Sequence, residues 1–306
     1  MNVSSSTRPV ISSPGKLRHF LQHHSLVCYF VIAYGLSWLA WVPFVLSQSG
    51  LGVLPVSLSQ FAIIPGLYLG PLLSGFLMTA ATEGKPGVQN LLRRSVLWRV
   101  GWQWYLFTLI GIPVFLFLGY FILPGAVAVL HSPFPQILWL YPLFLTLEIF
   151  TSALGEEPGW RGFALPRLQT RYGALLGTLI LGVLWGCWHL PLFLTTWGGG
   201  AGWLDVGGFL LKTVGTALMI TWVFNHTRGS LLLAILLHAS IDAFGTVMVL
   251  TNLFDAHWMQ QNSSLSQLIG LGVVPLFLIL VTRGRLGYQR ASSSSNDVPS
   301  PDESET

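Results

Sequence analysis

Two adjacent carboxylates, Glu156 and Glu157, are the residues of this sequence with the clearest chemical potential. They close a long apolar run, and Arg161 follows four residues after the second of them. An ionisable side chain inside a bilayer costs roughly 2.5 to 3.5 kcal/mol on insertion scales, and such residues mark functional sites by default. Arg161 could hold Glu157 ionised, because residues four apart share a helix face. Glu156 could then activate a water as a general base. The alternative is that Glu157 and Arg161 form an interfacial ion pair with no catalytic role.

Two histidines, His189 and His238, lie inside other apolar runs that carry almost no charge. Intramembrane histidines normally face the interior of a helix bundle or a water-filled cavity. Asp242 follows His238 by four residues and could accept the hydrogen of one ring nitrogen, which would leave the other nitrogen for substrate, water or metal. Glu148 lies eight residues before Glu156, roughly 80° around a regular helix, and its role as a structural or supporting group stays open.

The composition indicates that these residues belong to a membrane protein. Of the 306 residues, 52% are hydrophobic and only 8% are charged, whereas typical globular chains carry roughly 25% charged residues. The two cysteines, Cys28 and Cys187, both lie in apolar runs and have no metal-ligand spacing, so neither a disulfide framework nor a thiolate zinc site is expected. The net charge of +4 is explained by basic segments between the apolar runs, and no nucleic-acid function is expected.

The predicted fold is all-α, a polytopic membrane bundle of about eight transmembrane helices. Proline after Glu157 disfavours the α conformation at that glutamate, so we expect the helix to break or kink at the acidic pair. A basic loop with Lys85 and Arg94 is expected after the second span, and Lys212 is expected near one end of the sixth. The expected spans are about 26–46, 61–81, a third ending near 130, 137–154, 174–197, 206–224, 230–250 and 265–282.

The basic residues predict how this bundle is oriented. Fourteen of the fifteen lysines and arginines fall in the amino-terminal arm, in the even-to-odd connections or in the carboxy-terminal tail, and Lys212 is the exception. The positive-inside rule then places both termini and the acidic-pair loop on the cytoplasmic side. Three regions are expected: a polar cytoplasmic arm (1–25), one membrane domain (26–282) and a basic, then acidic and Ser-rich, disordered tail (283–306).

Three motifs in order along the chain, EEPGWRGFALPRLQ at 156–169, WGCWHLPLF at 185–193 and ILLHASIDAF at 235–244, together resemble the CPBP (Abi) family of intramembrane endopeptidases, which includes the CAAX prenyl proteases. The likeness covers about residues 26–282. It implies a membrane protease that cleaves a peptide bond with a water activated by glutamate and histidine.

The resemblance assigns roles to six residues: Glu156 as catalytic base, Glu157 and Arg161 as its supporting pair, His189 and His238 as the histidines that bind and polarise the reacting groups, and Asp242 at the last motif position. The family has Asn or Asp there, and we expect Asp242 to orient His238. The family is often labelled as metalloproteases, so Zn²⁺ bound by Glu156, His189 and His238 is the alternative. No HExxH helix is present, and we favour catalysis without a metal or other cofactor.

Two functions of other classes compete with the protease. A proton- or ion-coupled transporter could use the same Glu and His residues as a relay, although inverted repeats are not apparent in the sequence. A non-catalytic peptide-binding immunity protein is the second competitor. The expected partners are a peptide or protein substrate, prenylated or otherwise membrane-anchored, and the lipid bilayer. The resemblance implies a bacterial plasma membrane, and the sequence sets no oligomeric state.

Overall fold

The computed structural model of the chain describes residues 15–199 and 202–289. Within these residues the structure is helical, and the only extended pairing is an isolated bridge between Leu130 and Phe254. Eight helical segments are long and apolar enough to cross a membrane. The prediction of an all-α polytopic bundle with about eight spans is therefore confirmed.

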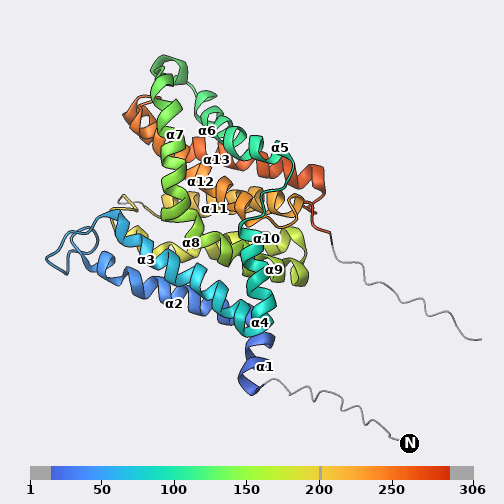
Figure 1. Cartoon of the computed structure of the whole chain (residues 1–306). Coiled ribbons are helices and arrows are strands. Elements are labelled where there is room, and N and C mark those ends of the chain that lie inside the picture. The colour runs from blue at the N-terminus through green and yellow to red at the C-terminus, as the bar shows by residue number, and fades with distance from the viewer. Residues whose placement is uncertain (1–14, 200–201, 290–306) are drawn as a thin grey trace, which may run out of the picture.

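Thirteen α-helices are described, and Figure 1 shows how they are arranged. In chain order they are α1 (Lys16–His23), α2 (Ser25–Leu46), α3 (Ile64–Leu67), α4 (Leu73–Ser95), α5 (Trp102–Leu106), α6 (Ile112–Phe121), α7 (Phe134–Glu148), α8 (Leu154–Glu157), α9 (Leu165–Tyr172), α10 (Ala174–Trp188), α11 (Trp203–His226), α12 (Leu231–Leu250) and α13 (Ala256–Thr282). Four π-helical segments (Tyr68–Leu72, Phe107–Gly111, Ile149–Ala153, Pro158–Ala164) join several of these helices into longer continuous runs.

Helix α12 is the centre of the bundle. It packs against α6, α7 and α11, and two thirds of its most apolar stretch (67%) is buried inside the protein. Helices α2 and α4 lie together on one side of the molecule, while α6 and α13 lie together on the other (Figure 1). Because α12 carries His238 and Asp242, the sequence places its candidate reactive groups on the helix with the most protein around it.

Several predicted boundaries were wrong. The basic loop expected after the second span is largely helical, because α4 continues to Ser95 after a local break at Gly84, which has a φ of 70°. The third span ends at Phe121, before a turn with Gly125 in the left-handed conformation. The amino-terminal arm contains helix α1. Leu286, in the predicted tail (283–306), is fully buried, and the Ser-rich part of that tail (291–306) lies outside the described residues.

The helix does not break at the acidic pair, although a break was one of the two outcomes expected there, and the other outcome, a kink, stays a prediction. Glu157 (φ −61°, ψ −36°) and Pro158 (φ −61°, ψ −31°) both keep helical dihedral angles, and the chain continues as the π-helical segment Pro158–Ala164. A π-helix bonds i to i+5, and such bulges can accommodate residues that do not fit an α-helical ladder. The acidic pair therefore lies within a helical run rather than in a loop.

The π-helical segment 158–164 packs closely against α4 and the residues before it. A Cβ added to Gly75 of α4 would lie 2.9 Å from the Cα of Gly159, and a Cβ on Gly159 would collide with the Pro71 carbonyl oxygen and the Tyr29 hydroxyl. Glycine at both positions thus permits a backbone approach that any side chain would prevent. This contact fixes the segment that follows the acidic pair.

We predict that Gly159→Ala destabilises the protein by about 1 to 3 kcal/mol, the usual cost of overpacking. Gly272→Ala, in α13, is the matched control because a Cβ there meets nothing within 4 Å. A thermal-unfolding comparison in one detergent should show a lower midpoint for Gly159→Ala alone. Equal midpoints would mean that the close approach contributes nothing to stability.

Candidate active site

A cavity of about 680 Å³ opens among α7, α8, α10, α11 and α12. A volume of this size is typical of ligand sites, which measure about 300 to 1,000 Å³. Its acidic and basic lining residues are Glu148, Glu156, His189, Lys212, His238 and Asp242. The structure therefore brings Glu156, His189 and His238 together on one cavity, which is the arrangement that the protease hypothesis requires.

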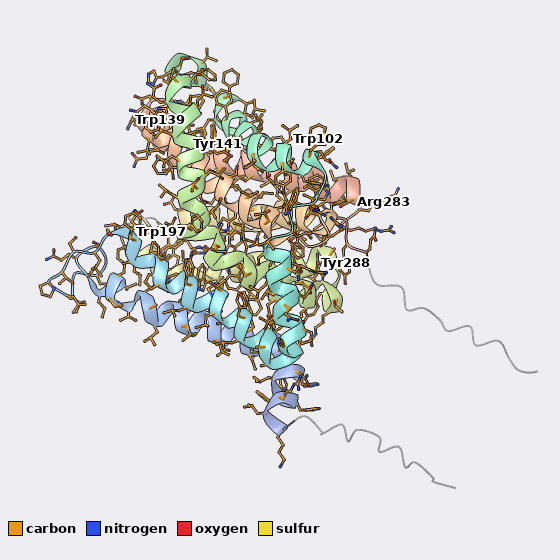
Figure 2. The ribbon with its side chains drawn as sticks, in the orientation of Figure 1. Trp102, Trp139, Tyr141, Trp197, Arg283 and Tyr288 are labelled. Carbon is orange, nitrogen blue, oxygen red and sulfur yellow. The ribbon has the colours of Figure 1, made fainter. Side chains whose placement is uncertain are left out.

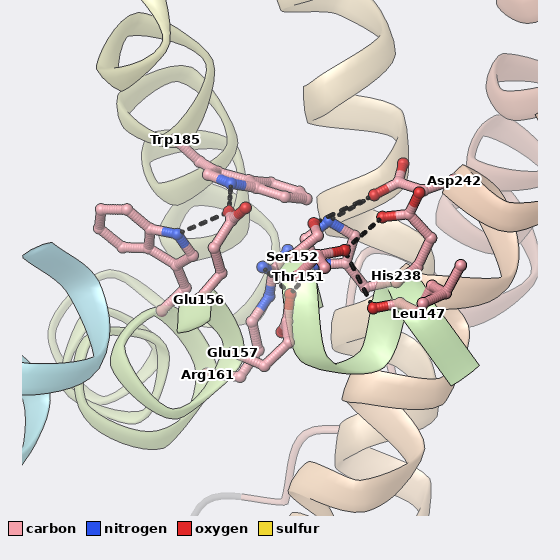
Figure 3. A network of polar contacts seen from close by, with 11 residues as sticks. Leu147, Thr151, Ser152, Glu156, Glu157, Arg161, Trp185, His238 and Asp242 are labelled. Carbon is pink, nitrogen blue, oxygen red and sulfur yellow. Dashed lines mark hydrogen bonds and ion pairs between the residues drawn. The ribbon is translucent and has the colours of Figure 1, made fainter. Parts of the chain in front are cut away.

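Glu156 is held by two tryptophans. Its Oε2 accepts hydrogen bonds from the indole nitrogens of Trp160 (3.2 Å) and Trp185 (2.5 Å), as Figure 3 shows for Trp185. Its other oxygen, Oε1, accepts no hydrogen bond from the described residues. The side chain is only 2% exposed, yet it lines the cavity. One oxygen is thus fixed by indole donors, and the other is left for a group inside the cavity.

Glu157 points away from the cavity into a buried ion pair. Its Oε1 lies 2.9 Å from Nη1 of Arg161 and 2.8 Å from Nδ1 of His238, and neither Glu157 nor Arg161 has any exposed surface (Figure 3). The Arg161 guanidinium also lies 4.3 Å from the ring centre of Trp185. A buried carboxylate is costly unless it is paired and hydrogen-bonded, and Arg161 supplies that pairing.

His238 is fixed from both sides of its ring. Nδ1 is in contact with Glu157, and Nε2 lies 3.4 Å from Oδ2 of Asp242, which also accepts a hydrogen bond from Ser152 (3.2 Å). The sequence predicts that Asp242 orients the ring. In the structure the shorter contact comes from Glu157, a residue 81 positions away in the sequence. Nε2 is therefore the nitrogen on the side of Asp242 and the cavity.

His189 lies at the end of α10 and is surrounded by aromatic rings. Its Nδ1 is 2.9 Å from the carbonyl oxygen of Trp185, and its ring stacks on Trp197 with 5.6 Å between ring centres. Phe209 covers another side at 5.1 Å. A backbone carbonyl can only accept, so Nδ1 carries the hydrogen of this bond and Nε2 is the nitrogen left for other groups.

Four residues near the site were not singled out as site residues from the sequence: Trp160, Trp185, Ser152 and Lys212. Both tryptophans stand four residues from a candidate, Trp160 after Glu156 and Trp185 before His189, so helical spacing could have found them. Lys212 was expected near the end of its span. It is the tenth residue of the 24 in α11 and lines the cavity.

Glu148, whose role the sequence left open, also lines the cavity. The π-helical segment Ile149–Ala153 separates it from Glu156, and Thr151 lies 3.5 Å from its Oε2. A π turn is wider than an α turn and rotates less per residue. The 80° displacement expected for a regular helix is therefore reduced, and both glutamates reach the same cavity.

The side chains as arranged do not form a zinc site. Among the residues that the structure describes, no three His, Cys, Asp or Glu side chains are close enough to hold one metal ion. We therefore derive no catalytic step through a metal.

Comparison with known proteins finds similarity to one group of proteases. Residues 137–244 match the family model described as type II CAAX prenyl endopeptidase Rce1-like, and this range contains all six predicted site residues. A curated relative named CAAX prenyl protease 2, from the archaeon Methanococcus maripaludis, is 31% identical over 115 residues, which is 36% of this chain and 41% of the relative. The chain thus spans less than half the length of the relative that it matches.

The buried ion pair leads to a prediction about stability. Glu157→Gln should destabilise the protein by about 3 to 5 kcal/mol, because it leaves the Arg161 charge buried without a counter-charge. Glu83→Gln makes the same change in a partly exposed pair with Arg167, and it should cost no more than about 1 kcal/mol. Thermal unfolding of both variants would test this. Similar midpoints would show that the buried pair is not a major source of stability.

Proposed function

We propose that this protein is an intramembrane endopeptidase of the CAAX prenyl protease type, which hydrolyses a peptide bond of a membrane-associated or lipidated substrate with a water activated by Glu156. The observation that carries the proposal is the cavity itself, where one free oxygen of Glu156 shares a lining with His189 and His238. Eight apolar helices surround this site in a multi-pass membrane protein. The family match extends over the segment that supplies every one of these groups.

The proposed reaction begins with proton transfer. Oε1 of Glu156 takes a proton from water as the water oxygen attacks the carbonyl carbon of the scissile bond. The carbonyl oxygen becomes an oxyanion, and Nε2–H groups of His238 and His189 are the candidate donors to it. Glu156 then gives the proton to the departing nitrogen as the C–N bond breaks. The products are a carboxyl group and an amine, and Glu156 returns to its starting state.

The buried pair has a supporting role in this proposal. Glu157 Oε1 accepts from Arg161, and the hydrogen of its contact with His238 is assigned to Nδ1 of that ring. Asp242 beside Nε2 favours a hydrogen on that nitrogen as well, so His238 can act as a donor toward the oxyanion. We expect Asp242→Ala to reduce the rate for this reason. No metal takes part in the proposed reaction, and Zn²⁺ is the alternative that a chelator tests.

We further propose that both termini lie in the cytoplasm, on the basis of the positive-inside rule, and that the membrane is a bacterial plasma membrane. The relative is named CAAX prenyl protease 2. A prenylated cysteine followed by a short carboxy-terminal segment is therefore the substrate class that we propose. The bilayer is then the second partner, since it holds both the enzyme and the lipidated substrate.

The first test is cleavage of farnesylated and unmodified peptides by detergent-purified protein. Glu156→Gln should lower kcat by about 10² to 10⁴, the contribution usual for a general base, while Glu83→Gln retains wild-type cleavage. Chelator should leave the rate unchanged; loss of activity with chelator and its recovery with Zn²⁺ would replace the metal-free proposal. If wild type cleaves no peptide but carries ion or substrate flux in proteoliposomes, the protein is a transporter.

The indole bonds to Glu156 allow a finer test. Trp185→Phe keeps an aromatic ring beside Arg161 but removes the hydrogen-bond donor to Glu156 together with part of the ring volume, and we expect kcat to fall by about tenfold, the value of one good hydrogen bond. Trp188→Phe is the matched control, because the Trp188 indole nitrogen is buried and has no partner among the described residues. Equal kcat values for the two variants would show that the Trp185 donor does not position the base.

A further inference from the structure

Lys212 is the only lysine or arginine among the described residues that line the cavity. It lies nine residues after the start of α11 and fourteen before its end, roughly 13 Å and 21 Å along the helix axis. A lysine this far inside a span carries a cost of roughly 2.5 to 3.5 kcal/mol on insertion scales. We therefore expect Lys212 to have either a function or a neighbouring negative charge that pairs with it.

The acidic residues of the cavity do not pair directly with Lys212. Within the described part of the chain, no carboxylate oxygen lies within 4.0 Å of its Nζ. The neighbouring acids have other partners: Asp242 has Ser152 and His238, and Glu156 has its two indoles. Nζ of Lys212 lies 5.0 Å from the centre of the Phe209 ring. The ammonium group is thus available on the cavity wall.

We propose that Lys212 binds the carboxy-terminal carboxylate of the peptide substrate and thereby selects substrates that end a few residues after the scissile bond. This inference rests on the proposed function and adds a specificity residue to it. The three carboxylates on the described cavity wall would repel an anion, and the Lys212 ammonium supplies an opposing positive charge. Thr216, one helical turn further along α11, lines the cavity too and offers a hydroxyl donor.

The chemistry of the site favours this ligand over a large anion. Lys212 is half-buried behind an aromatic ring, and the cavity measures about 680 Å³. A peptide carboxylate is small, carries one charge and suits an ammonium with three donors. In a CAAX substrate the carboxylate stands three residues after the prenylated cysteine, which an extended chain spans in roughly 10 Å. Cleavage after the cysteine and binding at Lys212 can then occur in one cavity.

The experiment compares three probes that differ in the presence and position of one carboxylate. They are an S-farnesylated peptide ending in Cys-Val-Ile-Met with a free carboxylate, the same peptide with a carboxy-terminal amide, and the amide with an internal aspartate. We expect wild type to prefer the free carboxylate by about ten- to a hundredfold in kcat/KM, the worth of a charge-assisted hydrogen bond. Lys212→Gln should lower the rate with the carboxylate peptide to that of the amide, and leave the amide rate unchanged. Lys212→Arg should restore part of the preference.

Binding of the same peptides to Glu156→Gln and to Glu156→Gln/Lys212→Gln separates this inference from the proposed function. A carboxylate preference in affinity that Lys212→Gln removes supports the inference even if no peptide is cleaved, and in that case only the protease proposal fails. Equal affinity for carboxylate and amide peptides would overturn the inference, as would a preference that persists without Lys212. Equal binding of the internal aspartate and the free carboxylate would also overturn it, because it would show a general anion site.

Discussion

The arrangement of the whole site depends on one buried charge, the guanidinium of Arg161. It has no contact with solvent, and its partner Glu157 is equally buried. Glu157 in turn contacts His238 on α12, and the face of Arg161 lies against Trp185, which donates to Glu156. A single cation therefore sets the position of both glutamates and of one histidine. Because a charge without a partner is so costly in this environment, the geometry has little freedom to change.

The π-helical segments explain how two consecutive glutamates can have different surroundings. Glu156 faces the cavity, whereas Glu157 faces the ion pair, and the backbone stays helical through both and through Pro158. The π turns on either side change the rotation per residue, so residues from Glu148 to Arg161 reach targets that a regular α-helix would separate. Close packing of Gly159 on the preceding helices holds this unusual run in place.

The cavity combines acidic groups with a surface of aromatic and aliphatic side chains. Its lining includes residues from Gln60, before α3, to Leu271 in α13, so many apolar side chains surround the reactive groups. Side chains cover the outer faces of the helices around it, among them the exposed Trp102 and Trp139 (Figure 2). Indole rings of this kind are typical of the membrane interface. The structure thus joins a polar centre to walls that suit an apolar chain.

The sequence alone determined the membrane class and the number of spans, because apolar runs of about twenty residues have few other interpretations, and the isolated charges within them marked the candidate reactive residues. The sequence did not determine which groups contact each other. Helical spacing found the Glu157–Arg161 pair, since it lies four residues apart, but the Glu157–His238 and Trp185–Glu156 contacts join different helices. The continuation of the helix through Pro158 and the position of Lys212 on the cavity wall were also decided by tertiary structure. Local propensity describes one helix at a time, whereas these features depend on how neighbouring helices pack and on where a buried charge finds its partner.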